Sequence, residues 1–178
     1  MGLEYFSIAE ADAFVYFQGR SETPSVLEIL GRLSHATGKL KAAVDFYTRS
    51  LLLESSPSVF RNLGAAYHAD GNKQMAFASY QQALGIYMET QNASSSDPAV
   101  PSMSESDFRA GTALVYLKLA FLYEDLAAED WPQAAQHSEF CYEYFLEHAD
   151  AQDTGVLTRL GNLHVNEHEP AKAVATYN

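Results

Sequence analysis

The residues whose types and spacing could do chemistry stand near the C-terminal end, in the run His164-Val165-Asn166-Glu167-His168. The run matches H-x-x-E-H, in which two imidazoles about one helical turn apart bind zinc and a carboxylate activates water. A catalytic zinc site takes three protein ligands, and no third ligand is patterned further downstream. The string therefore needs a second interpretation, which depends on the elements that carry it.

Other reactive residue types are scattered. His35 and His68 are 33 residues apart and could form a metal-binding or pH-sensing pair, although two solvent-facing residues explain them more simply. Cys141 is the only cysteine, and no histidine is patterned to activate it as a nucleophile. Glycine-rich phosphate loops, supported carboxylate pairs and cofactor fingerprints are absent from the sequence. We predict no enzyme, no cofactor and no metal site.

The elements that must position these residues are revealed by a duplication between Thr23 and Met88. The segment 24–31, Pro-Ser-Val-Leu-Glu-Ile-Leu-Gly, is repeated with changes as Pro-Ser-Val-Phe-Arg-Asn-Leu-Gly at 57–64. The offset of 33 residues is a period typical of helical solenoid repeats. Three further pairs keep this offset: Gly38 with Gly71, Ala43 with Ala76, and Tyr47 with Tyr80.

Each copy has the signals of two helices joined by a short turn. Thr23 can cap the first helix, and Pro24 fits its first position, where a missing N–H costs nothing. Gly38 can adopt the left-handed conformation that ends this helix. A second helix is predicted from Lys39 to about Glu54.

Two more copies follow with the same spacing. Tyr116, Leu119, Ala120 and Tyr123 match the first helix of the third copy, whose turn is about two residues longer and contains Trp131. In the fourth copy, Leu160, Gly161 and His164 match the first helix. His164 thus occupies a packing position, which favours a core residue over a zinc ligand.

These residues resemble the tetratricopeptide repeat, with its Leu-Gly, Tyr, Ala and Phe or Tyr positions. The resemblance implies an all-α, right-handed solenoid of about four helix-turn-helix repeats, the last incomplete, within a longer array. The expected parts are an N-terminal helix at 3–20, repeats at 23–56, 57–90, 107–150 and 152–178, and a flexible Ser/Pro-rich loop at 91–106.

The loop is predicted from its composition, which is polar and broken by two prolines. Ser102 and Ser104 each precede an acidic residue by three positions, as acidic-directed kinases prefer. They are candidate phosphorylation sites, although serine-rich linkers contain such matches by chance.

Charge and composition exclude several function classes. A formal charge of −12 argues against nucleic acid and against anionic lipid, since both attract basic surfaces. No apolar run approaches the roughly 20 residues that span a bilayer. With one cysteine an intrachain disulfide is impossible, which favours an intracellular, cytoplasmic location.

The resemblance also implies a binding surface, because the first helix of each tetratricopeptide repeat lines a concave groove that takes a peptide or helix of a partner protein. We predict a protein-interaction scaffold module, part of a larger multi-subunit assembly. The groove residues carried over by position are Arg32, Arg61, Asn62, Leu117, Lys118, Phe121, Arg159 and Asn162.

Two alternatives remain open. A co-chaperone or targeting receptor would read a short C-terminal motif, but Glu28 stands where the family's carboxylate clamp has a lysine and would repel a terminal carboxylate. The chain could instead be the regulatory domain of an enzyme whose catalytic part lies outside it.

Overall fold

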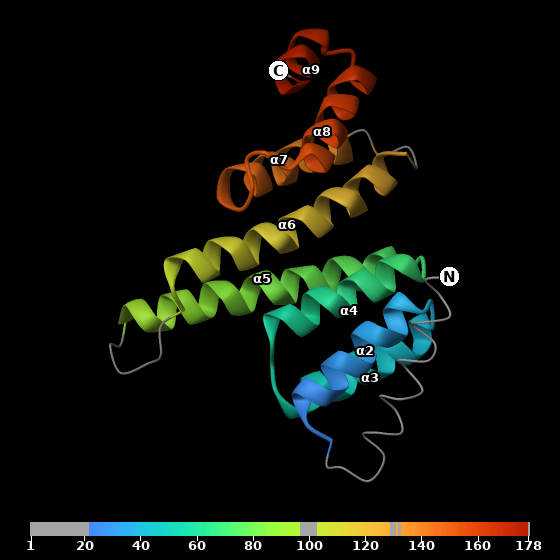
Figure 1. The fold of residues 1–178 in the computed structure, drawn as a ribbon, viewed down its shortest axis with the longest axis vertical. Coiled ribbons are helices and arrows are strands. Elements are labelled where there is room, and N and C mark those ends of the chain that lie inside the picture. The colour runs from blue at the N-terminus through green and yellow to red at the C-terminus, as the bar shows by residue number, and fades with distance from the viewer. Residues whose placement is uncertain (1–21, 97–102, 129–130, 132, 178) are drawn as a thin grey trace. The chain divides into compact units, whose positions relative to one another are not determined.

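The computed structural model describes residues 22–96, 103–128, 131 and 133–177. Within this part every regular element is an α-helix (Figure 1). The predicted helix at 3–20 lies outside the described residues. The described helices form four helix–turn–helix pairs, which are α2 (Pro24–Ala36) with α3 (Leu40–Leu53), α4 (Pro57–Ala69) with α5 (Lys73–Ser96), α6 (Glu105–Ala127) with α7 (Gln133–His148), and α8 (Thr154–Asn166) with α9 (Pro170–Tyr177).

The chain divides into two compact units, Met1–Ile86 (unit 1) and Tyr87–Asn178 (unit 2). In unit 1, α3 packs against both α2 and α4. In unit 2, α6 packs against α7, α7 against α8, and α8 against α9. Helices within each unit therefore pack against their neighbours in the sequence, as expected of a repeat protein.

The helices begin and end at the capping and turn residues that the sequence predicts. The Thr23 hydroxyl accepts a hydrogen bond from the Val26 N–H at 3.3 Å, and Pro24 is the first helical residue of α2. Gly38 and Gly71 adopt φ angles of 76° and 81° in the turns that follow α2 and α4. These predictions of caps and turns are confirmed.

Close approach of the two helices in a pair depends on a glycine on the first and a tyrosine on the second. A Cβ atom at Gly31 would lie 2.5 Å from the ring of Tyr47, and one at Gly64 would lie 2.6 Å from the ring of Tyr80. Gly161 faces Tyr177 in the same way. Since both Tyr47 and Tyr80 are fully buried, these rings fill the centre of their helix pairs.

The third pair achieves the same packing with different residues. Ala120 replaces the glycine of α6, and Ser138 replaces the tyrosine of α7. The buried Ser138 hydroxyl donates a hydrogen bond to the Ala120 carbonyl at 3.1 Å. The additional methyl group on one helix is accommodated because the facing side chain is small.

The predicted loop at 91–106 is wrong at both ends, because α5 continues to Ser96 and α6 begins at Glu105. Tertiary contacts support this helix despite its polar sequence. Tyr87 is buried where its ring lies against Gly111, and it meets Phe108 edge-on with ring centroids 6.5 Å apart. The Gln91 amide donates to the Glu105 carboxylate at 3.1 Å. The centre of the predicted loop, residues 97–102, lies outside the described residues.

The turn after α8 contains a residue with a strained backbone conformation, and this strain can be tested. His168 has a φ of 61° and takes the turn position that Gly38 and Gly71 occupy elsewhere. An L-residue in the left-handed region costs about 1–2 kcal/mol. We therefore expect His168→Gly to raise the free energy of unfolding by about 1 kcal/mol. Urea denaturation monitored by circular dichroism measures this change, and an unchanged or lower stability would contradict the strain.

Candidate functional site

The zinc-like string does not form a site in the structure. The His164 side chain is buried, with 4% of its surface exposed, as its packing position predicted. Glu167 caps the end of α8, and His168 follows in the turn. Both are exposed to solvent, whereas His164 points into the helix pair. The two imidazoles therefore do not lie on one helical face as H-x-x-E-H chemistry requires.

Cys141 has the properties of a packing residue. It is a buried free cysteine, and burial raises the pKa of its thiol to about 12. The thiolate, which is the nucleophilic form, is therefore scarce at neutral pH. The interpretation of Cys141 as a small buried residue is confirmed.

The predicted groove residues of unit 2 meet around Phe121. The Lys118 Nζ lies 5.5 Å from the centroid of the Phe121 ring, and the Arg159 guanidinium carbon lies 4.7 Å from it. These are cation–π distances. Two cationic groups and one aromatic ring from α6 and α8 thus form a single cluster, which we call the unit 2 face.

Neighbouring residues orient the unit 2 face. Arg159 donates a hydrogen bond to Glu124 at 2.8 Å, and the Tyr177 hydroxyl donates to Asn162 at 2.8 Å. Phe121 packs against Tyr142 with ring centroids 6.0 Å apart. Burial raises the pKa of Tyr142, and the adjacent Glu124 carboxylate raises it further. The arginine and the asparagine of the predicted set are therefore held in place by intramolecular hydrogen bonds.

The predicted groove residues of unit 1 are Arg32, Arg61 and Asn62. The Asn62 amide donates to the Glu28 carboxylate at 3.3 Å. Burial raises the pKa of Tyr47, and the positive charge of Arg32 nearby offsets part of this rise. Burial likewise raises the pKa of Tyr80, and the charge of Arg61 offsets part of that rise. Arg32 and Arg61 thus each lie near a buried tyrosine.

A pocket of about 310 Å³ in unit 2 was missed by sequence reasoning, apart from Asn162. Its apolar walls come from Ala127, Ala128, Ala135 and Leu163, and its polar rim from Glu124, Asn162, Asn166 and Glu167. These residues belong to α6, α7, α8 and the residues that follow α6 and α8. The volume is near the lower limit for ligand pockets and suits one inserted side chain.

Of the candidate phosphorylation sites, Ser104 is described and Ser102 lies outside the described residues. Ser104 is exposed and caps α6, because its hydroxyl oxygen accepts a hydrogen bond from the Asp107 N–H at 3.0 Å. Its hydroxyl also lies 2.6 Å from the Asp107 carboxylate. Regulation at either serine stays a prediction.

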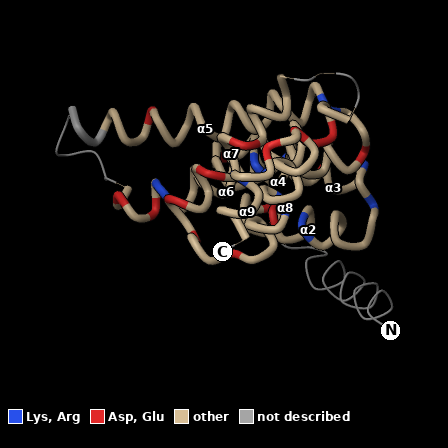
Figure 2. Tube along the Cα trace, turned by 90° about the horizontal axis from the view of Figure 1, so that it is seen from above, with Lys and Arg blue, Asp and Glu red and all other residues tan. Residues whose placement is uncertain are grey.

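Acidic residues outnumber basic ones in this chain. Lys and Arg number 11 against 23 Asp and Glu, and basic residues are sparse along the described helices (Figure 2). Among the described helices none is both long and apolar enough to cross a membrane.

The helix pairs define the described part of the chain as an all-α repeat protein of the solenoid class. Residues 59–94 match the family model of the tetratricopeptide repeat. The predicted tetratricopeptide resemblance is confirmed for this segment, and the helices described above confirm the predicted all-α fold class. Tetratricopeptide arrays generally act as non-catalytic scaffolds for protein interaction.

The comparison with curated proteins gave no match. Among solved structures, the crystal structure of BtubC (BKLC) from P. vanneervenii aligns with a TM-score of 0.67 and 16% identity, over 98% of this chain and 70% of that one. A crystal structure of MamA aligns with a TM-score of 0.66 and 17% identity, over 97% of this chain and 84% of that one. At these identities the similarity shows the fold alone.

Proposed function

We propose that this chain is a protein-interaction module whose unit 2 face binds a partner segment with acidic and apolar side chains. The observation that supports this most directly is the cluster of Lys118 and Arg159 around the Phe121 ring. The chain as a whole has a net charge of −12, but this surface carries two positive charges at one aromatic ring. It is therefore complementary to the acidic side chains of a partner.

The pocket beside this face suits the apolar part of such a partner. Glu124 and Asn162 line the pocket, and Glu124 also accepts the hydrogen bond of Arg159. A partner carboxylate near Lys118 and Arg159 would thus lie close to an alanine-walled cavity. Peptides bind helical grooves in this way, with charge setting the orientation and apolar anchors supplying affinity.

Arg61, Asn62 and Arg32 form a second candidate surface in unit 1. Since Asn62 is already bonded to Glu28, a terminal carboxylate would meet a negative charge there. This geometry favours an internal partner segment over a C-terminal motif. We further propose that the module works inside the cell as a subunit of a larger assembly, as its single cysteine and its fold suggest.

Binding can be tested with a peptide selected from a random displayed library against the full 178-residue chain. We expect Lys118→Glu to weaken this peptide roughly tenfold or more, because an attractive charge becomes repulsive. Arg61→Glu tests the unit 1 surface in the same way. Fluorescence polarisation gives the affinities, and unchanged melting and helicity show that the variants fold.

Lys41→Glu, on the exposed surface of α3, is the matched control with the same charge change. If Lys41→Glu weakened binding as much as Lys118→Glu, only net charge would matter and the proposed face would be wrong. An amidated copy of the peptide separates the remaining alternative. Loss of binding on amidation would identify a receptor for C-termini and contradict binding of an internal segment.

A further inference from the structure

A cluster of ionisable side chains at the α7–α8–α9 corner of unit 2 is not used by the proposed interaction. We call it the corner cluster and define it as Glu139, His164, Glu169, Lys172 and Thr176. One nitrogen of His164 and one carboxylate oxygen from each of Glu139 and Glu169 all lie within 4.8 Å of one another. Three ligand atoms of the types that bind transition metals thus converge from α7, α8 and the residue before α9.

His164 is the fixed member of this set. Its ring is buried, its Nδ1 lies 3.2 Å from the Thr176 hydroxyl, and its Nε2 lies 3.2 Å from a Glu139 oxygen. The Thr176 hydroxyl also donates to the Lys172 carbonyl at 2.9 Å. The imidazole is thus held from both sides, with Nε2 directed at the Glu139 carboxylate.

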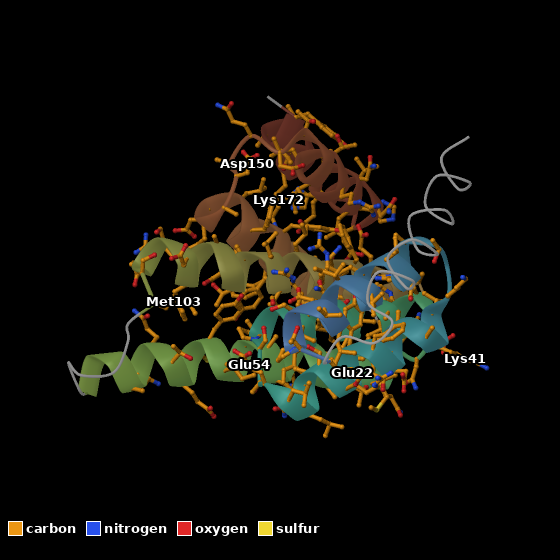
Figure 3. All side chains as sticks on the ribbon, turned by 60° about the horizontal axis from the view of Figure 1, so that its bottom comes forward. Glu22, Lys41, Glu54, Met103, Asp150 and Lys172 are labelled. Carbon is orange, nitrogen blue, oxygen red and sulfur yellow. The ribbon has the colours of Figure 1, made fainter. Side chains whose placement is uncertain are left out.

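Lys172 already places a positive charge in the corner cluster. Its ammonium lies 2.9 Å from Glu139 and 2.8 Å from Glu169. Burial by itself raises the pKa of Glu139, but the hydrogen bonds from Lys172 and His164 outweigh it and hold this pKa below its usual value. The Lys172 side chain, labelled in Figure 3, belongs to α9. It is half exposed, so it can move away into solvent.

We propose that the corner cluster binds a divalent transition cation of the Zn²⁺ type through His164, Glu139 and Glu169, in exchange for the Lys172 ammonium. Zinc takes imidazole nitrogen and carboxylate oxygen at about 2.0–2.2 Å, so neighbouring ligands come to about 3.3–3.5 Å apart. The partly exposed glutamates can close the remaining distance. Thr176 would orient the imidazole from the other side, as hydrogen-bond partners of metal-binding histidines do.

This site differs from the H-x-x-E-H string, with which it shares only His164. The bound ion would join α7, α8 and the start of α9, so its effect would be structural. The fourth position would be open to water. The ligands come from two repeats and lie far apart in the sequence. No local sequence motif therefore predicts the site.

The test uses the metal-stripped full chain, titrated with ZnCl₂ by isothermal calorimetry and followed by thermal melting, with MgCl₂ in parallel. We expect one Zn²⁺ per chain, a rise in Tm, and no response to Mg²⁺. Glu169→Gln, a change on the surface, should weaken zinc at least tenfold. Lys172→Met should strengthen it at least tenfold, since no ammonium competes.

His168→Asn is the matched control, because asparagine tolerates the left-handed turn and this residue lies outside the proposed site. Its zinc affinity should equal that of the unchanged chain. The proposal fails if Glu169→Gln binds as well as the unchanged chain, or if Lys172→Met gains nothing. Loss of zinc binding in His168→Asn would also overturn it, in favour of the H-x-x-E-H string.

Discussion

Replacing Gly64 with alanine is expected to lower the free energy of unfolding by about 1–3 kcal/mol, the usual cost of overpacking a core. The added Cβ would lie 2.6 Å from the Tyr80 ring and 3.1 Å from the Ala76 carbonyl. Tyr80 is fully buried and cannot turn out of the way without opening a gap. Urea denaturation of both proteins measures the difference.

Gly85→Ala is the matched control for this prediction. Gly85 lies on α5, and a Cβ added there would meet nothing within 4 Å. Alanine in an open helical position stabilises by roughly 0.5–1 kcal/mol relative to glycine. The same substitution should therefore have opposite signs at two helical sites. If both variants were stabilised, close helix packing would not depend on Gly64.

Removing the Tyr80 side chain should have the largest effect on stability. Tyr80→Ala would leave a cavity between α4 and α5, and deletion of a buried aromatic ring costs about 3–5 kcal/mol. Tyr80→Phe keeps the ring and removes only the hydroxyl, which is buried and has no hydrogen-bond partner among the described residues. We expect this variant to equal or exceed the unchanged chain in stability, because an unpaired buried hydroxyl costs about 1–3 kcal/mol.

Thermal and urea denaturation distinguish the two roles of the tyrosine. A strong loss of stability in Tyr80→Phe would mean that the hydroxyl has a bound partner in solution. A small loss in Tyr80→Ala would mean that the surrounding helices collapse into the space. Either result would change the account of packing in the second helix pair.

Much of the fold is predictable because its rules are local or strictly periodic. Thr23, Gly38 and Gly71 act through their own backbone neighbourhood, and Gly31 and Tyr47 recur at one fixed offset. The extension of α5 was missed for the opposite reason. The extension contains Asn92 and three serines at 94–96, which are weak helix formers. Contacts of Tyr87 and Gln91 with α6 support it.

The candidate site was predicted less completely. Position within the repeat identified Lys118, Phe121 and Arg159, which the structure brings together. It did not identify Glu124 as the partner of Arg159, although their separation of 35 residues is about one repeat. The same spacing joins Glu28 to Asn62, 34 residues apart. Such pairs could have been found by comparing equivalent positions of neighbouring repeats. The pocket could not have been found in this way, because the alanines that form its walls have no distinguishing sequence pattern.

The exchange of a glycine–tyrosine pair for Ala120 and Ser138 has a consequence for how repeats diverge. If an ancestral repeat carried the common pair, two single changes were needed, and their order matters. If glycine changes to alanine first, the new methyl group clashes with the tyrosine ring. If tyrosine changes to serine first, a cavity is left beside the glycine. Each intermediate is therefore less stable than the repeat with the original pair or with the exchanged pair. Repeats of this protein are therefore expected to exchange these two positions only as a matched pair. A hybrid that joins α4 to α7 would inherit an empty space, and one that joins α6 to α5 a collision.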